Sequence, residues 1–116
     1  MALNRVFRLR KASEFSRVRQ QGRSLASRLL VLAWMPNEEN KLRIGFIVSK
    51  RISKQAVERN YIKRLLAEAI RGLLPELPTG WDIVLSARNT ITSVNVAVLK
   101  QDVVSLLQRA QLLKPD

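Results

Sequence analysis

The side chains with the clearest chemical meaning in this chain are cations, and they are gathered in two segments. Residues 1–28 contain eight Arg or Lys residues and one Glu, and residues 50–64 contain six Arg or Lys residues and one Glu. The other 73 residues balance, so these two segments account for the whole formal net charge of +12. Guanidinium and ammonium groups bind phosphate oxygens and displace counterions from nucleic acids. Because solubility alone does not require clustering of one sign, the pattern predicts a polyanionic partner.

The same sequence argues against a complete catalytic site on the protein. It has no His for general acid–base catalysis and no Cys to act as a nucleophile or thiolate metal ligand. Its Ser and Thr residues therefore lack the His of a conventional triad. Two-metal hydrolysis needs several converging carboxylates, yet only Glu38 and Glu39 are adjacent, in a predicted turn. No Gly-rich phosphate loop is present. We expect no catalytic residues, no metal ligands and no small-molecule substrate.

Composition indicates one globular domain over residues 1–116, because 47% of the residues are hydrophobic and 26% are charged. No apolar run reaches 18 residues, so we expect no membrane partner. The N-terminus lacks the apolar stretch of a secretory signal, and a cytoplasmic location fits. Residues 1–11 and 112–116 are expected to be flexible tails.

The first half of the chain predicts a short helix followed by two strands. Ser13 is the expected N-cap of a helix over 13–20, with Gly22 as its stop. Apolar runs over 29–35 and 42–49 predict strands, and the turn-forming residues 36–40 between them suggest an antiparallel hairpin. In the second strand one face carries alternating apolar side chains: Leu42, Ile44, Phe46 and Val48.

The strongest helix prediction runs from Ala56 to about Leu74. At 100° per residue it has a core stripe and an opposite, mostly basic face. The core stripe comprises Ile62, Leu65, Leu66, Ala69, Ile70 and Leu73. The basic face comprises Arg59, Asn60, Lys63, Arg64, Glu68 and Arg71. Such a face could lie along a nucleic-acid backbone.

The last third predicts a strand over 81–87 and a helix that begins at Thr92 or Ser93 and reaches about Ala110. The full order is α-β-β-α-β-α. A strand, a helix and another strand in succession suggest a βαβ crossover. The expected fold class is α+β, a small single-domain α/β sandwich.

Phe15 lies on the short first helix, where it could stack on an unpaired RNA base or anchor the core. Both alternatives stay open from the sequence. Trp34 and Phe46 are expected in the core because both lie in strongly apolar strands. The role of Trp81, at the start of a strand, stays open.

Residues 45–71, GFIVSKRISKQAVERNYIKRLLAEAIR, closely resemble the signature of the bacterial ribonuclease P protein component family. That signature is a strand ending in V-S-K-K/R, then a loop, then a helix opening with A-x-x-R-N-R-x-K-R-L. Weaker similarity covers nearly the whole chain. It includes F-x-x-V followed by Gly (Phe15, Val18, Gly22) and a D-I/Y-V/I-x-x-A-R strand from Asp82 to Arg88.

The resemblance implies roles for the matched positions and an unusual left-handed βαβ crossover. The residues implied to bind the catalytic RNA are Arg59, Asn60, Tyr61, Lys63 and Arg64. Tyr61 replaces the usual second Arg of the motif, and it could stack on RNA or cover the helix edge. The residues implied to line the cleft for the 5′ leader are Phe15, Arg19, Ser49, Lys50 and Arg51. Arg19 stands where the family often has a second aromatic. Further basic RNA contacts are expected at Arg8, Arg10, Lys11 and Lys54.

The implied function is to assist the removal of the 5′ leader from precursor tRNA. The implied partners are the ribonuclease P catalytic RNA and the precursor tRNA. Mg²⁺ is expected in the holoenzyme, mainly on the RNA subunit, where catalysis takes place. Three other hypotheses share the basic surface: a ribosomal or RNA-chaperone protein, an independent nuclease and a DNA-binding module. The last is ranked lowest because no helix-turn-helix pattern is present.

Overall fold

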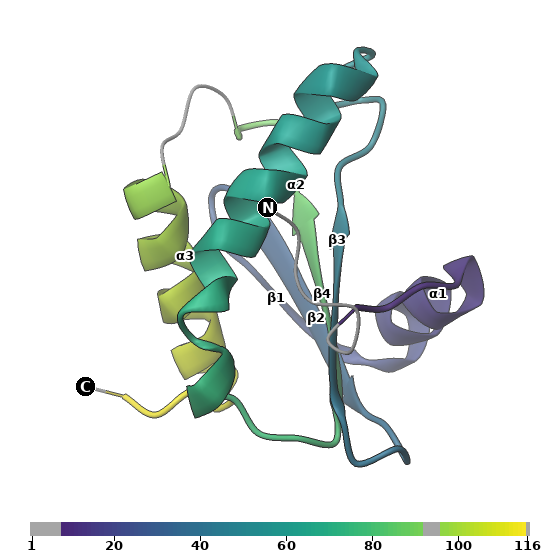
Figure 1. Ribbon diagram of the computed structural model, residues 1–116, viewed down its shortest axis with the longest axis vertical. Coiled ribbons are helices and arrows are strands. Elements are labelled where there is room, and N and C mark those ends of the chain that lie inside the picture. The colour runs from purple at the N-terminus through teal and green to yellow at the C-terminus, as the bar shows by residue number, and fades with distance from the viewer. Residues whose placement is uncertain (1–7, 92–95, 116) are drawn as a thin grey trace.

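The computed structural model describes residues 8–91 and 96–115, which form three α-helices and four strands (Figure 1). In chain order the elements are α1 (Ala12–Gln21), β1 (Arg23–Ala26), β2 (Leu30–Pro36), β3 (Leu42–Ile47), α2 (Ala56–Arg71), the 3₁₀-helix η2 (Leu74–Glu76), β4 (Trp81–Ala87) and α3 (Val96–Arg109). The α+β class and the predicted elements are confirmed, and β1 is a strand that the sequence did not predict. Thr92 and Ser93, the expected start of the last helix, lie outside the described residues.

The four strands make one mixed sheet in the order β1-β2-β4-β3. β1 pairs with β2, and β2 with β4, in antiparallel orientation, whereas β3 and β4 are parallel. The predicted hairpin between the second and third strands is therefore wrong, because β4 lies between them. The observed hairpin joins β1 to β2. Its turn is held by the Ser27 hydroxyl, which accepts the backbone N–H groups of Leu29 (3.2 Å) and Leu30 (3.0 Å).

The β3-α2-β4 unit is the expected crossover. In Figure 1 the chain rises along β3, descends along α2 in front of the sheet, and rises again along β4 to the left of β3. In the usual right-handed crossover the second strand would lie to the right. The crossover is therefore left-handed, as the resemblance implied. The crossover places β4 beside the whole length of β3. β3 in turn leads into the basic loop before α2.

The main core lies between the sheet and the pair α2 and α3. The apolar face of β3 points into it, with Leu42, Ile44 and Val48 all buried. Trp34 is buried, and Phe46 is partly buried against the same cluster, which confirms both core predictions. Trp81 also packs partly buried against this core.

The helix α1 covers the other face of the sheet, away from α2 and α3 (Figure 1). A smaller buried cluster forms beneath it from Leu9, Val18, Ala33 and Val84, with Phe15 packed against it. The sheet therefore has a large hydrophobic core on one side and a small one on the other. This second side carries the first of the predicted leader-binding residues.

Two contacts fix the ends of α1. The N-cap is Lys11, so the predicted Ser13 cap is wrong, and Ser13 lies inside the helix. The carboxylate of Glu14 accepts hydrogen bonds from the backbone N–H groups of Arg10 and Lys11, each at 3.0 Å, and the helix therefore begins at Ala12, with its cap two residues before Ser13. At the other end, a Cβ on Gly22 would lie 2.5 Å from the carbonyl oxygens of Val18 and Trp34. Only glycine fits this close approach.

The flexibility of residues 1–11 and 112–116 stays a prediction, and parts of both segments are tied to the core. The backbone N–H of Leu9 donates to the Ile44 carbonyl at 3.0 Å, and the Leu9 side chain is buried. Leu112 and Leu113 are also buried. Among the described residues, no helix has the length and apolar character needed to cross a membrane.

Candidate nucleic-acid interface

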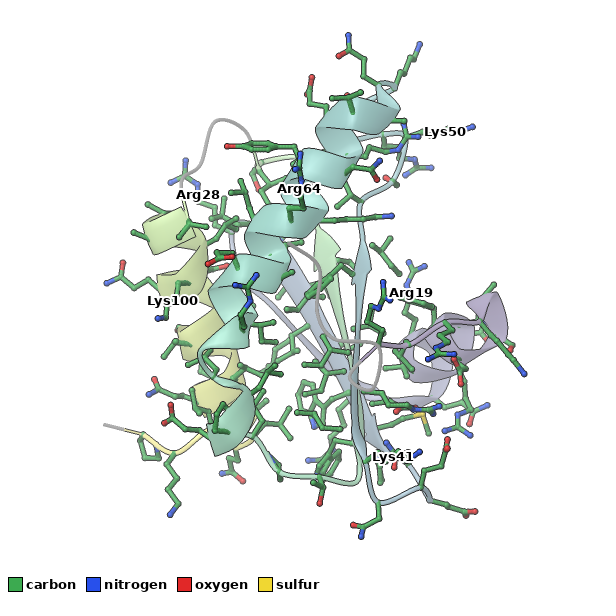
Figure 2. All side chains as sticks on the ribbon, viewed as in Figure 1. Arg19, Arg28, Lys41, Lys50, Arg64 and Lys100 are labelled. Carbon is green, nitrogen blue, oxygen red and sulfur yellow. The ribbon has the colours of Figure 1, made fainter. Side chains whose placement is uncertain are left out.

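The basic face of α2 is open to solvent. Asn60, Lys63 and Arg64 are exposed, and 53% of Tyr61 is accessible. Within residues 8–91 and 96–115, the side chains of Lys63 and Arg64 make neither an ion pair nor a hydrogen bond. Figure 2 shows Arg64 on the outer side of the helix. The predicted face therefore has the exposed, uncompensated cations that phosphate binding requires.

Arg59 differs from its neighbours on the same helix. It is partly buried, and its Nη1 donates to the backbone carbonyl of Ser53 at 2.9 Å. The guanidinium thus connects the first turn of α2 to the preceding loop. The other guanidinium nitrogens have no hydrogen bond within the described residues, so Arg59 can brace the loop and still contact RNA.

The loop between β3 and α2 presents Ser49, Lys50, Arg51 and Lys54, all exposed. Its backbone is ordered by a turn, in which the N–H of Ile52 donates to the Ser49 carbonyl at 3.0 Å. Ile52 packs partly buried against the main core. The core contact and the turn hold the loop while its cations point outward, as Lys50 does in Figure 2.

A cleft of about 190 Å³ lies where α1, the edge of β3 and α2 meet. Its lining residues are Arg8, Leu9, Phe15, Ile44, Gly45, Phe46, Lys63, Arg64 and Ala67. The ring of Phe15 lies against the backbone of β3, because a Cβ on Gly45 would overlap its Cε1 and Cζ atoms. Phe15 therefore packs on the small core, as the core alternative predicted, and also lines the cleft. Stacking of its ring on an RNA base stays a prediction.

The cleft brings together only some of the predicted residues. Phe15, implied to contact the leader, meets Lys63 and Arg64, implied to contact the catalytic RNA. Arg19 is exposed on α1 and lies on the α1 side of the sheet with Lys50, but neither lines this cleft (Figure 2). Arg10 and Lys11 are exposed at the start of α1. The predicted residues form a broad surface around the edge of β3.

An ionic cluster that the sequence did not predict lies under α1, centred on Arg43. Its Nε and Nη2 donate to the two carboxylate oxygens of Asp82, each at 2.9 Å, across the β3–β4 ladder. Its Nη1 lies 2.8 Å from Glu14 Oε2 and 2.9 Å from Glu39 Oε2. Asp82 is fully buried, and only 14% of the Arg43 side chain is exposed. The Asp82 hydrogen bond is the main reason why the pKa of Arg43 is raised.

This cluster joins α1 to the sheet. Glu14 is on α1, and Arg17 Nη2 of the same helix lies 3.6 Å from Asp82 Oδ2. Asn37, in the β2–β3 turn, donates from Nδ2 to Asp82 Oδ1 at 2.8 Å. Backbone N–H groups of Lys11 and Arg10, followed by Arg43, lower the pKa of Glu14. The cluster thereby positions α1, which carries Phe15. A charged residue inside the apolar strand 81–87 was the sequence signal, because a buried carboxylate needs a partner.

The carboxylates of Glu14, Glu39 and Asp82 converge on a guanidinium. In the part of the chain that the structure describes, no group of three His, Cys, Asp or Glu side chains is placed to hold a metal ion.

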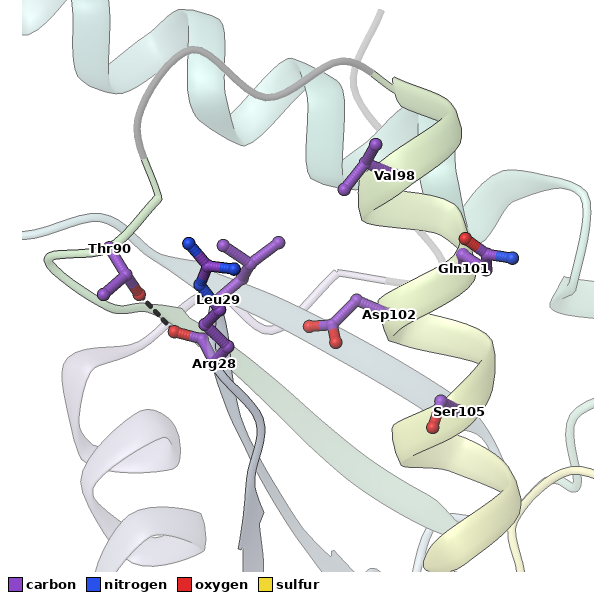
Figure 3. Close-up of a pocket in the computed structure, with 7 residues that line it drawn as sticks. All are labelled: Arg28, Leu29, Thr90, Val98, Gln101, Asp102 and Ser105. Carbon is purple, nitrogen blue, oxygen red and sulfur yellow. Dashed lines mark hydrogen bonds between the residues drawn. The ribbon is translucent and has the colours of Figure 1, made fainter.

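A cavity of about 490 Å³ lies between the β1–β2 turn and α3 (Figure 3). Its lining residues are Arg28, Leu29, Thr90, Val98, Gln101, Asp102 and Ser105, none of which was predicted to bind RNA. The hydroxyl of Thr90 donates to the Arg28 carbonyl, and the Ser27 hydroxyl donates to Asp102 Oδ2 at 2.5 Å. These bonds connect the turn to the end of β4 and to α3, so we assign this region a structural role.

Comparison with known sequences gives a consistent result. The family profile described as Ribonuclease P matches residues 3–111. The ribonuclease P protein component of Chloroflexus aurantiacus is 40% identical over 112 residues, which cover 96% of this chain and 82% of that protein. The ribonuclease P protein component of Caldanaerobacter subterraneus is 39% identical over 108 residues, covering 93% and 92% of the two chains.

Solved structures agree with the sequence comparison. The Staphylococcus aureus RNase P protein superposes with a TM-score of 0.84 at 28% identity, covering 93% of this chain and 98% of that one. The Thermotoga maritima RNase P protein gives a TM-score of 0.79 at 27% identity, covering 88% and 96%. With a strand, loop and helix that match the family signature and a fold shared with its solved members, the chain belongs to the ribonuclease P protein component family.

Proposed function

We propose that this chain is the protein subunit of ribonuclease P that binds the catalytic RNA and the 5′ leader of precursor tRNA. The basic face of α2 and the loop before it bind the catalytic RNA. The cleft at Phe15 receives the single-stranded leader. The observation that carries the proposal is the meeting of Phe15 with Lys63 and Arg64 in one cleft. An aromatic ring suits a base, and two exposed cations without an ion pair in the described part of the chain suit its phosphate.

In this proposal the protein contributes binding, and the RNA subunit performs the hydrolysis. Mg²⁺, held mainly by the RNA, would supply the activation of water. The protein's exposed cations reduce the repulsion between catalytic RNA and precursor tRNA, two polyanions that must lie against each other. Its place of action is the cytoplasm.

The proposal is tested by reconstituted cleavage of precursor tRNA at low Mg²⁺ concentration. The three reactions contain the RNA subunit alone, the protein alone and both together. We expect efficient cleavage at the leader junction only in the combined reaction, with a larger benefit of the protein at low salt, where phosphate repulsion is least screened. Cleavage by the protein alone would show that it is an independent nuclease.

Variants locate the interface within the same assay. Arg64→Ala and Phe15→Ala should weaken the benefit of the protein, whereas Lys100→Ala on α3 should not. A protein that binds RNA but never assists cleavage would instead be a ribosomal or chaperone protein.

A further inference from the structure

We infer that a second cavity beside the cleft is a phosphate subsite for the single-stranded leader beyond Phe15, an inference that rests on the proposed function. This cavity, of about 330 Å³, adjoins the first at Arg8, which lines both. Its lining residues are Arg8, Arg10, Lys11, Glu14, Glu39, Lys41 and Arg43. We call it the Lys41 cavity.

The fold assembles the Lys41 cavity from segments that are distant in sequence. Arg8, Arg10 and Lys11 come from the segment that leads into α1, and Lys41 comes from the end of the β2–β3 turn. The backbone places the two segments together, because Arg8 forms a parallel bridge with Ile44 and Leu9 donates to the Ile44 carbonyl. Lys41 was not among the RNA contacts predicted from the sequence, since its neighbours Glu38 and Glu39 conceal it in a locally acidic turn.

The charge of the Lys41 cavity is not compensated by its own acidic residues. Glu14 and Glu39 both pair with Arg43, at 2.8 Å and 2.9 Å, and Arg43 is further bound to buried Asp82. The side chains of the other four cations, those of residues 8, 10, 11 and 41, are exposed and make no ion pair within the described residues. The lining carries five cations and two carboxylates, and even with buried Asp82 counted the positive charges exceed the negative charges by two, so the cavity attracts an anion.

The position of the Lys41 cavity next to the Phe15 cleft indicates which anion fits best. Arg8 borders both cavities, so a strand with one nucleotide at Phe15 can carry its next phosphates past Arg8 toward Lys41. A polynucleotide has a phosphate at every residue and can contact both cavities at once, which links their binding energies. An acidic peptide would gain less from the cleft, where the partly buried ring of Phe15 favours a base.

The test compares precursor tRNAs with leaders of increasing length in the reconstituted holoenzyme. Lys41→Glu reverses a charge in the Lys41 cavity, and Lys41→Gln only removes it. Lys100→Glu is the matched control, because Lys100 is an exposed lysine on α3, well away from Lys41 (Figure 2). Thermal unfolding of each free protein verifies that the exposed substitutions leave the fold intact.

We expect Lys41→Glu to weaken precursor binding about tenfold with long leaders, and Lys41→Gln to weaken it less. Neither variant should differ from Lys100→Glu with a leader too short to pass Arg8. The slope of log affinity against log salt should also fall by about one for long leaders only.

The outcomes separate this inference from the proposed function. If Lys41→Glu and Lys100→Glu behave alike at every leader length while the protein still assists cleavage, the subsite is refuted and the proposed function stands. If the unaltered protein has no effect at any leader length, the proposed function fails. If a polyglutamate peptide binds the free protein through Lys41 but leader binding is unchanged in Lys41→Glu, the occupant is an acidic peptide and the inference is overturned.

Discussion

Arg43 and Arg64 belong to two regions in which the same side-chain type has opposite electrostatic surroundings. Arg43 is mostly buried and meets three carboxylates, those of Glu14, Glu39 and Asp82. Arg64 is exposed on α2 and makes no ion pair within the described residues. The difference teaches that a charge counted in the sequence is not always a charge available to a ligand. The Arg43 region positions α1, and the α2 region is free to bind phosphate.

The largest expected effect comes from breaking the paired region at its buried carboxylate. Asp82→Ala leaves Arg43 without its bidentate partner and should lower the free energy of unfolding by about 3–5 kcal/mol. Urea denaturation measures this loss. Glu38→Ala, in an exposed turn, is the control and should change stability by less than about 0.5 kcal/mol. Equal losses in the two variants would mean that the ionic cluster does not hold the fold.

The unpaired region should respond in the opposite way. Arg64→Ala should leave the free energy of unfolding within about 0.5 kcal/mol of the original, because the side chain is exposed and has no ion pair with any residue that the structure describes. Affinity for the catalytic RNA should fall by roughly 1.5–3 kcal/mol, since a charged hydrogen bond to phosphate is lost. Filter binding over a range of salt concentrations measures both the affinity and its salt slope. An unchanged slope would remove Arg64 from the phosphate contacts.

Arg59 is intermediate between Arg43 and Arg64, because its side chain is partly buried and donates a hydrogen bond to the backbone. Arg59→Ala removes the bond to the Ser53 carbonyl and should cost about 1 kcal/mol of stability, with faster amide exchange in residues 49–55. A double-mutant cycle with Lys50→Ala should show coupling in RNA affinity, because a loosened loop no longer holds Lys50 in place. Additive effects would indicate that Arg59 acts on RNA alone and does not brace the loop.

The smallest effect is expected from the pH dependence of Glu14. Its pKa is lowered in the folded state from 4.5, so its stabilising contribution is present above pH 4.5 and is lost as pH falls through the folded-state pKa. The original protein should therefore lose more stability on acidification than Glu14→Gln. Urea denaturation at a series of pH values measures the two slopes. Parallel slopes would show that the Glu14 contacts contribute nothing to folding.

Local sequence patterns predicted most elements of the fold but not how the strands pair. The strand 81–87 was predicted with the bounds that the structure has, and α2 begins at Ala56 as predicted. The hairpin prediction was wrong because adjacency in sequence favours local pairing, whereas β3 pairs with a strand that follows a whole helix. β1 was missed because Arg23–Ala26 is short and has no apolar alternation.

The sequence predicted which residues belong to the candidate site better than it predicted how they are arranged in space. The basic face of α2 followed from helical geometry, and the structure leaves it exposed. That Lys41 lies beside Arg10 depends on the parallel approach of the N-terminal segment to β3, which no local pattern encodes. Arg59 is partly buried because it donates to the Ser53 carbonyl in the preceding loop. A helical wheel contains only helix residues, so it could not predict this contact.

The central place of β4 in the sheet also sets the timing of folding during synthesis. The β1–β2 hairpin can form early, but β3 has no strand beside it until residues 81–87 have left the ribosome, because its neighbour in the sheet is β4. The carboxylate that Arg43 needs arrives on the same strand. Until then the nascent chain has a half-built sheet flanked by the two cationic segments. Completion of β4 therefore gives the two cationic segments a fixed arrangement, and nonlocal pairing of this kind makes folding slow.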